Sequence, residues 1–164
     1  MTVYGTPGNF RTYLTARGLS ATNSADDTIV NGKLLVASEW IDSKYGDYFP
    51  GRRVAGRNQD REWPRNGAVD AFGYAISSIG YPTEVENATY EAARRELDNP
   101  GSLSVDFTPN PYKRAAVSGA VSVEYNIMAQ ATDRQIQLQI VDEILRPVLD
   151  ECAEESTLSG ESGR

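Results

Sequence analysis

Residues 26–45 read DDTIVNGKLLVASEWIDSKY, and this stretch decides the fold class. Its apolar residues recur at spacings of four and three, as they do along one face of a helix: Val30, Leu34, Ala37, Ile41 and Tyr45. A glycine at position 32 costs about 1 kcal/mol relative to alanine in a helix interior, but it does not interrupt this stripe. The stretch therefore predicts a long amphipathic helix that faces a core.

Helical patterns also occur on both sides of this stretch. Residues 9–17, NFRTYLTAR, predict a short helix with Asn9 as its N-cap. Another helix is expected to begin at Thr83, with Glu86 completing a capping box, and to end at the sequence DNPG. Residues 132–151 have isoleucines four apart and predict a final helix, which a proline at position 147 should kink or nearly end. The chain is therefore expected to be mainly α-helical.

Two segments depart from helical periodicity. Residues 111–125 contain two β-prone arms around Ser118 and Gly119, which predicts a β-hairpin. Residues 46–82 are rich in proline and glycine and predict a long irregular loop, ordered because it also contains aromatic residues. We therefore expect a small bundle of three to four helices with one hairpin and one long arm. This single domain should span residues 1–150, followed by a flexible acidic tail at 151–164.

The composition excludes several classes of function. The 164 residues carry a net charge of -7, contain no histidine and include a single cysteine, Cys152. Catalytic triads, His-ligated metal sites and cysteine clusters all lack a key residue. The sequence also lacks a phosphate-binding glycine loop and an apolar run long enough to span a bilayer. We therefore expect a protein without enzymatic activity, cofactor, metal or membrane span.

The most concentrated chemical signal is the run GRRVAGRNQDREWPRNG at residues 51–67. It places five arginines within fourteen residues around one tryptophan: Arg52, Arg53, Arg57, Arg61, Arg65 and Trp63. One interpretation is a surface that stacks bases and binds the phosphates of single-stranded nucleic acid. In the other, Trp63 fills a pocket and the arginines pair with carboxylates of the same or a neighbouring subunit. The negative net charge favours the second interpretation, because nucleic-acid binding depends on neutralising phosphates.

Several motifs together resemble a known family. They are YLTARG, REWPRNGAVDAFGYAI, YPTEVENATYEAA, VSGAVSVEY and ILRPVL, in that order along residues 9–150. This layout is similar to a family of tailed-bacteriophage proteins often described as DnaT-like single-stranded-DNA-binding proteins, whose structural relatives are head-tail connector adaptors. The most specific element of the resemblance is Trp63, Pro64 and Arg65. The acidic extension beyond Leu149 departs from the family's pattern.

The resemblance implies a homo-oligomeric ring, usually twelvefold, in the neck of the virion. Such a ring is assembled in the host cytoplasm and contacts the portal protein and the next neck or tail protein, and the genomic DNA passes through it without sequence-specific binding. Candidates for the subunit or partner interface are the loop motif and the final helix: Arg57, Arg61, Trp63, Pro64, Arg65, Ile144, Pro147 and Val148. The alternative is a single-stranded-DNA-binding replication accessory protein, with Arg57, Arg61, Trp63 and Arg65 as its DNA contacts.

Overall fold

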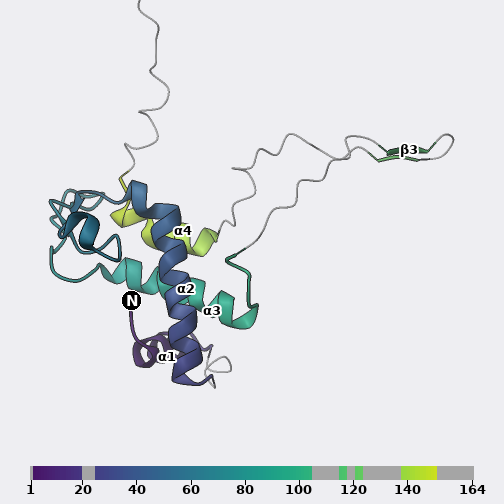
Figure 1. Ribbon diagram of the computed structural model, residues 1–164, viewed down its shortest axis with the longest axis horizontal. Coiled ribbons are helices and arrows are strands. Elements are labelled where there is room, and N and C mark those ends of the chain that lie inside the picture. The colour runs from purple at the N-terminus through teal and green to yellow at the C-terminus, as the bar shows by residue number, and fades with distance from the viewer. Residues whose placement is uncertain (1, 20–24, 105–114, 118–120, 124–137, 151–164) are drawn as a thin grey trace, which may run out of the picture. The chain divides into compact units, whose positions relative to one another are not determined.

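The computed structural model describes residues 2–19, 25–104, 115–117, 121–123 and 138–150 (Figure 1). The chain divides into two compact units, one of residues 1–103 with 138–164 and the other of residues 104–137. The predicted tail at 151–164 lies outside the described residues, as do residues 132–137 of the expected final helix.

In its described residues the first unit contains four α-helices, and the prediction of a mainly helical fold is confirmed. They are α1 (Pro7–Ala16), α2 (Asp27–Tyr45), α3 (Thr83–Asp98) and α4 (Gln139–Leu145). In Figure 1, α2 runs across α3, and α3 also packs against α4. The shorter α1 contacts both α2 and α3. A core therefore forms around α3, which has neighbours on several sides. None of the helices in the described ranges is long and apolar enough to cross a membrane.

Helix α2 supplies the predicted stripe. All five residues of that stripe are buried: Val30, Leu34, Ala37, Ile41 and Tyr45. The helix begins where an Asp26 carboxylate oxygen accepts a hydrogen bond from the Thr28 backbone N–H at 2.8 Å. Ser38 lies buried beside the stripe, and its hydroxyl accepts a hydrogen bond from the Tyr4 backbone N–H at 3.0 Å. The N-terminal segment is thereby fixed against α2.

The helix starts differ in part from their predictions. Helix α1 begins at Pro7 rather than at residue 9, because Thr6 caps it by accepting a hydrogen bond from the Asn9 N–H at 3.2 Å. Helix α3 begins at Thr83 as predicted, but the expected capping box is wrong. Pro82 occupies the N-cap position, and the Glu86 carboxylate instead accepts a hydrogen bond from the Tyr90 hydroxyl.

Helix α3 also buries two carboxylates, each of which is surrounded by donors. Glu91 accepts from the Arg17 guanidinium at 2.9 Å and from the Tyr13 hydroxyl at 3.1 Å. Glu96 accepts backbone hydrogen bonds from Gly101 at 2.7 Å and Leu103 at 3.1 Å. Burial raises the pKa of Glu96, but these donors and a nearby lysine outweigh it, so the pKa lies below its ordinary value.

The end of α4 and the β-hairpin belong to different units. Helix α4 ends at Leu145 and continues as one 3₁₀ turn, η5 (Arg146–Val148), so the predicted effect of Pro147 is confirmed. In the second unit, β3 (Ala115–Val117) pairs antiparallel with β4 (Val121–Val123), with Val117 opposite Val121. The predicted hairpin is thus confirmed for its described strands. Residues 118–120, which contain the predicted turn, lie outside the described ranges.

Candidate functional site

Trp63 lies inside the protein, at the centre of the loop formed by residues 46–82. Only 2% of its surface is exposed, and its ring meets Phe49 edge-on with 5.6 Å between centroids. The Trp63–Pro64 peptide bond is cis. The backbone N–H of Trp63 donates to the Tyr4 hydroxyl at 3.2 Å, whereas its indole N–H has no hydrogen-bond partner among the described residues. The indole is therefore not available to stack on a nucleic-acid base.

Tyr4 and Asp42 connect this tryptophan to helix α2. The Tyr4 hydroxyl donates to an Asp42 carboxylate oxygen at 2.6 Å while it accepts from the Trp63 N–H. Burial and the neighbouring carboxylate raise the pKa of Tyr4 above its ordinary value. Burial also raises the pKa of Asp42, although hydrogen bonds from Tyr4 and Arg61 oppose the shift. Because both groups are partly desolvated, the network depends on every partner remaining in place.

Arg61 completes the same network. Its side chain is 7% exposed, and its Nε donates to the Thr2 carbonyl oxygen at 2.7 Å. Its two terminal nitrogens lie 3.4 Å from an Asp42 oxygen and 3.6 Å from a Glu39 oxygen. This arginine therefore joins the loop to the N-terminal segment and to α2, where its charge is balanced by carboxylates.

Arg65 holds the loop closed on itself. Its guanidinium donates to the carbonyl oxygens of Pro50 at 2.9 Å and Gly51 at 3.0 Å, and it pairs with Glu62 at 2.6 Å. Gly51 has a φ of 74°, and a Cβ at that position would lie 2.5 Å from the Asn66 carbonyl oxygen. Glycine is therefore required for the close backbone approach that Arg65 fastens.

The other arginines of the run point outward. Arg52 and Arg57 are exposed and make no ion pair with any residue in the described ranges. Arg53 is exposed as well and lies 3.6 Å from a Glu62 carboxylate oxygen. Two of the five arginines, Arg61 and Arg65, are therefore buried and hydrogen-bonded within the fold, and the other three lie at the surface.

The second half of the loop forms a tight turn that exposes aromatic side chains. Strand β1 (Arg52–Arg53) pairs with β2 (Arg65–Asn66), and further along the chain Val69 bridges to Ala75. An Asp70 carboxylate oxygen accepts from the backbone N–H groups of Phe72 at 3.0 Å and Tyr74 at 2.8 Å.

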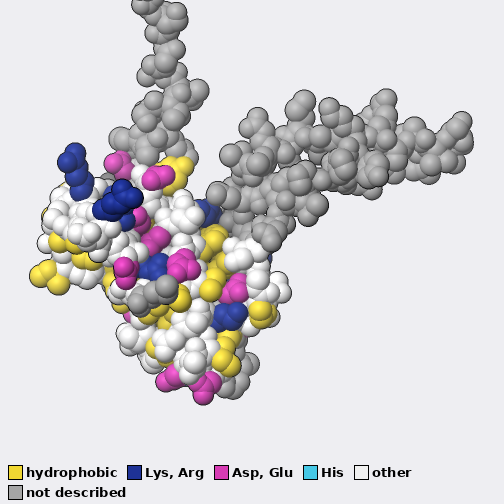
Figure 2. Space-filling model, viewed as in Figure 1, with side chains coloured by type: hydrophobic (Ala, Val, Ile, Leu, Met, Phe, Trp, Pro, Cys, Tyr) yellow, Lys and Arg dark blue, Asp and Glu magenta, His cyan; other side chains and the backbone are white. Residues whose placement is uncertain are grey.

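A backbone hydrogen bond of 2.8 Å from the Ala71 N–H to the Pro147 carbonyl oxygen attaches the turn to η5. The most exposed apolar side chains of the loop are Phe72 at 76%, Tyr74 at 73% and Ile79 at 86%, and we refer to these three as the apolar face. Figure 2 shows hydrophobic and basic side chains on the part of the surface that the loop forms, on the left of the view.

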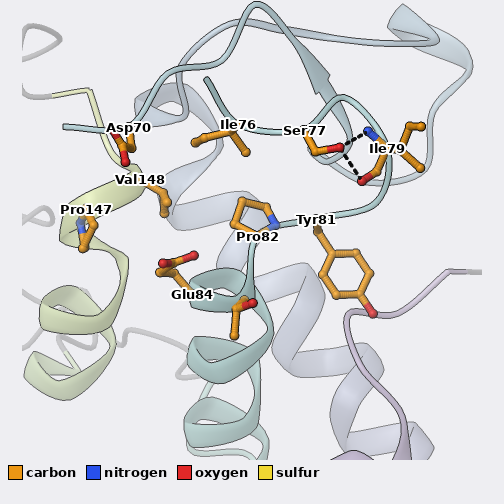
Figure 3. A pocket seen from close by; sticks show the side chains of 10 residues that line it. Asp70, Ile76, Ser77, Ile79, Tyr81, Pro82, Glu84, Pro147 and Val148 are labelled. Carbon is orange, nitrogen blue, oxygen red and sulfur yellow. Dashed lines mark hydrogen bonds between the residues drawn. The ribbon is translucent and has the colours of Figure 1, made fainter. Parts of the chain in front are cut away.

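A groove of about 270 Å³ lies next to Ile79 of the apolar face (Figure 3). Residues of the loop, the first turn of α3 and η5 line it: Asp70, Ile76, Ser77, Ile79, Tyr81, Pro82, Thr83, Glu84, Pro147 and Val148. Its two carboxylates, Asp70 and Glu84, have no ion pair among the residues that the structure describes. The groove therefore combines apolar side chains with two carboxylates that have no cationic partner among the described residues.

A family model described as "Putative DnaT-like ssDNA binding protein" matches residues 3–162 of the chain. The chain belongs to this DnaT-like family. Searches of curated proteins and of solved structures returned no significant match.

In this DnaT-like chain, the predicted interface residues do not form one surface. Trp63, Arg61 and Arg65 are buried in the loop, Pro64 is half-buried between them, and Arg57 is exposed. Three further candidates belong to the end of the final helix: Ile144, Pro147 and Val148. Pro147 and Val148 line the groove, whereas Ile144 is half-buried on α4.

The prediction missed the apolar face of the DnaT-like chain. The signal available in the sequence was FGYAI at residues 72–76, an apolar run with a glycine inside a loop. Such a run is equally consistent with burial, so only the structure shows that Phe72 and Tyr74 face solvent. In the described part of the chain, no three acidic, histidine or cysteine side chains gather closely enough to hold a metal ion.

Proposed function

We propose that this protein is a head-to-tail adaptor of a tailed bacteriophage, a structural virion protein without enzymatic activity. Copies of the chain form a ring, twelvefold by resemblance to connector adaptors, that docks beneath the portal in the neck of the virion. The ring is assembled in the host cytoplasm, contacts the next neck or tail protein, and lines the channel through which the genome passes.

The observation that carries this proposal is that the tryptophan and two of its neighbouring arginines are buried and bonded within the chain. Trp63 is buried, while Arg61 and Arg65 donate to backbone carbonyl groups and carboxylates of the same chain. Three of the four side chains that the DNA-binding alternative requires are thereby occupied within the fold. Besides three arginines, the loop exposes apolar and aromatic side chains, which are typical of the anchors of protein–protein interfaces.

Charge supports the same proposal. The chain has a net charge of -7, so a ring of many copies carries a large net negative charge. Like charge keeps the phosphate backbone of DNA from adhering to the wall. An acidic protein of this kind is suited to conduct DNA rather than to hold it.

Purified virions test the adaptor function. Quantitative mass spectrometry of virions is expected to detect the protein at about the copy number of the portal, and immobilised portal is expected to retain it from solution. A control protein of similar size and charge from the infected host should not be retained. Absence of the protein from virions, together with no portal binding, would contradict the adaptor function.

Single-stranded-DNA binding is the second candidate, because the family's printed description names that activity. The residues that could serve it are those that remain exposed on the loop, Arg52 and Arg57 together with Phe72 and Tyr74. Aromatic stacking contributes about 1 to 3 kcal/mol per base, and exposed arginines bind phosphates.

Fluorescence anisotropy with a labelled oligothymidine measures this second activity. Binding is expected to weaken steeply with added salt, because counterions are released when arginines neutralise phosphates. The double variant Arg52→Ser/Arg57→Ser should lower both the affinity and the salt dependence, whereas Arg95→Ser on α3 serves as an exposed control. Absence of binding at low salt would remove this candidate.

A further inference from the structure

The apolar face is exposed but rigidly held. Phe72 and Tyr74 lie on a turn whose backbone is fixed by the Asp70 carboxylate. The same turn is attached to η5 through the Ala71 to Pro147 backbone hydrogen bond. A backbone that is ordered before binding loses little conformational entropy when a partner covers it. The turn therefore presents its two aromatic residues on a backbone that is already ordered.

The loop that carries this face also exposes positively charged side chains. Arg52 and Arg57 are exposed and without an ion pair in the described ranges, and we refer to these two as the arginine edge. Arg52 lies in β1, which pairs with β2, and Arg57 lies in the 3₁₀ turn η3 (Gly56–Asn58), so both belong to the first half of the loop whose second half forms the aromatic turn.

The carboxylates of the groove supply the opposite charge. Asp70 and Glu84 line it together with Ile79, and neither makes an ion pair with a described residue (Figure 3). Carboxylates in this position repel the phosphate groups of a nucleic acid. They attract a cationic side chain, and the arginine edge of another copy of the same chain offers two.

We propose that the apolar face and its groove bind a second copy of this chain, with the arginine edge of one copy placed over the Asp70 and Glu84 groove of the next. This inference rests on the proposed adaptor ring and names the contact surface of that ring. The ring on which this inference rests has cyclic symmetry, so the contact is head to tail and the arginine edge of each copy meets the groove of the next. The apolar face is then covered between the charged pairs, where water is excluded.

Analytical ultracentrifugation of the full chain tests the apolar part of the contact, over concentrations from about 1 to 100 µM. The double variant Phe72→Ser/Tyr74→Ser is expected to weaken self-association at least about 30-fold, as for interface anchors. The matched control is Ile29→Ser, because Ile29 is 52% exposed on α2 and should leave self-association unchanged. Thermal melting by circular dichroism checks that each variant is folded.

Charge reversal tests the polar part. Arg57→Glu and Glu84→Arg are each expected to weaken self-association, because like charges then face each other across the contact. Combining both reversals in one chain should restore self-association, because the ion pair reforms with its signs exchanged. A merely structural role for either residue predicts no such rescue.

Neutral variants test the direction of the contact. A chain with Arg52→Ser/Arg57→Ser keeps its groove carboxylates, and a chain with Asp70→Asn/Glu84→Gln keeps its arginine edge. An equimolar mixture is expected to give dimers that do not extend, because only one head-to-tail contact can form between the two variants. If the mixture extended as the unmodified chain does, the head-to-tail arrangement would be wrong.

Three results would overturn the inference: a wild-type chain that stays monomeric at all concentrations, apolar-face variants that associate as the wild type does, or reversal without rescue. If the apolar-face variant lost oligothymidine binding while its self-association was unchanged, the face would bind nucleic acid and the inference would fail. Failure here leaves the adaptor function to be judged by the virion and portal measurements. Conversely, absence from virions together with no portal binding removes the adaptor function while self-association through this face remains measurable.

Discussion

Replacing Trp63 by alanine tests whether this residue anchors the loop. The substitution removes an indole that is 2% exposed and that packs edge-on against Phe49. A buried aromatic side chain accounts for about 150 to 250 Å² of apolar contact, which at about 25 cal/mol per Å² corresponds to roughly 4 to 6 kcal/mol.

Two considerations adjust this magnitude. The extended-chain reference overstates the area that folding buries, so the transfer free energy is an upper estimate. The indole N–H also lacks a partner among the described residues, and its removal recovers about 1 to 3 kcal/mol of desolvation cost. We therefore expect Trp63→Ala to lower the free energy of unfolding by about 3 kcal/mol, which is within the usual range for such truncations.

Urea denaturation followed by circular dichroism measures the effect, because helix content reports on the whole bundle. Near the melting temperature, a loss of this size corresponds to a decrease of roughly 6 to 12 °C for a chain of this length. Trp63→Phe is the first control, since it keeps a ring against Phe49 and removes the unpaired N–H. We expect it to cost less than about 1.5 kcal/mol.

Tyr74→Ala is the second control. Tyr74 is 73% exposed on the same loop, so its truncation should change the free energy of unfolding by no more than about 0.5 kcal/mol. If Trp63→Ala were as stable as Tyr74→Ala, the indole would not anchor the loop and the reasoning from its burial would be wrong.

Three further predictions concern the loop and the buried acids. Arg61→Lys should lower the free energy of unfolding by about 1 to 3 kcal/mol, because lysine cannot reach the Thr2 carbonyl and two carboxylates together. Urea denaturation measures this loss, and the exposed Arg57→Lys should show none. Gly51→Ala should lower the melting temperature more than Gly67→Ala. Both glycines have positive φ, but only at Gly51 would the added Cβ meet a backbone oxygen. Equal decreases in melting temperature would argue against that contact. The pKa of Glu96 is lowered in the fold, so its contribution is present above the unfolded value of about 4.5 and is lost as the pH falls through the folded pKa. Glu96→Gln should therefore show a shallower loss of stability on acidification, and an unchanged pH profile would contradict this.

Much of the helical framework could be predicted from the sequence. The stripe of α2 repeats with the helical period, and burial follows from that period once a core exists. The hairpin strands β3 and β4 were predicted for a comparable reason, because alternation and a Ser-Gly turn are local signals. Each of these features is specified by residues close together in the chain.

The loop could not be predicted to the same degree, because its contacts are made over long separations. Arg61 and Arg57 are the same residue type in the same run, yet only Arg61 lies opposite Thr2 and Asp42. Nothing local distinguishes them. The capping box at Thr83 failed for a related reason, since Glu86 is engaged by Tyr90 and by Asn9 of α1 rather than by the helix start.

Two backbone hydrogen bonds join the loop to the last described part of the chain. One runs from the Ala71 N–H to the Pro147 carbonyl oxygen, and the other from the Asp150 N–H to the Tyr48 carbonyl oxygen, each 2.8 Å long. During synthesis, a ribosome makes residues 46–82 long before it makes their partners. The aromatic turn therefore cannot acquire its final attachment until residue 150 has emerged. A nascent or truncated chain that lacks η5 is thus expected to fold its first helices without displaying a finished contact surface, which delays association until synthesis has passed that point.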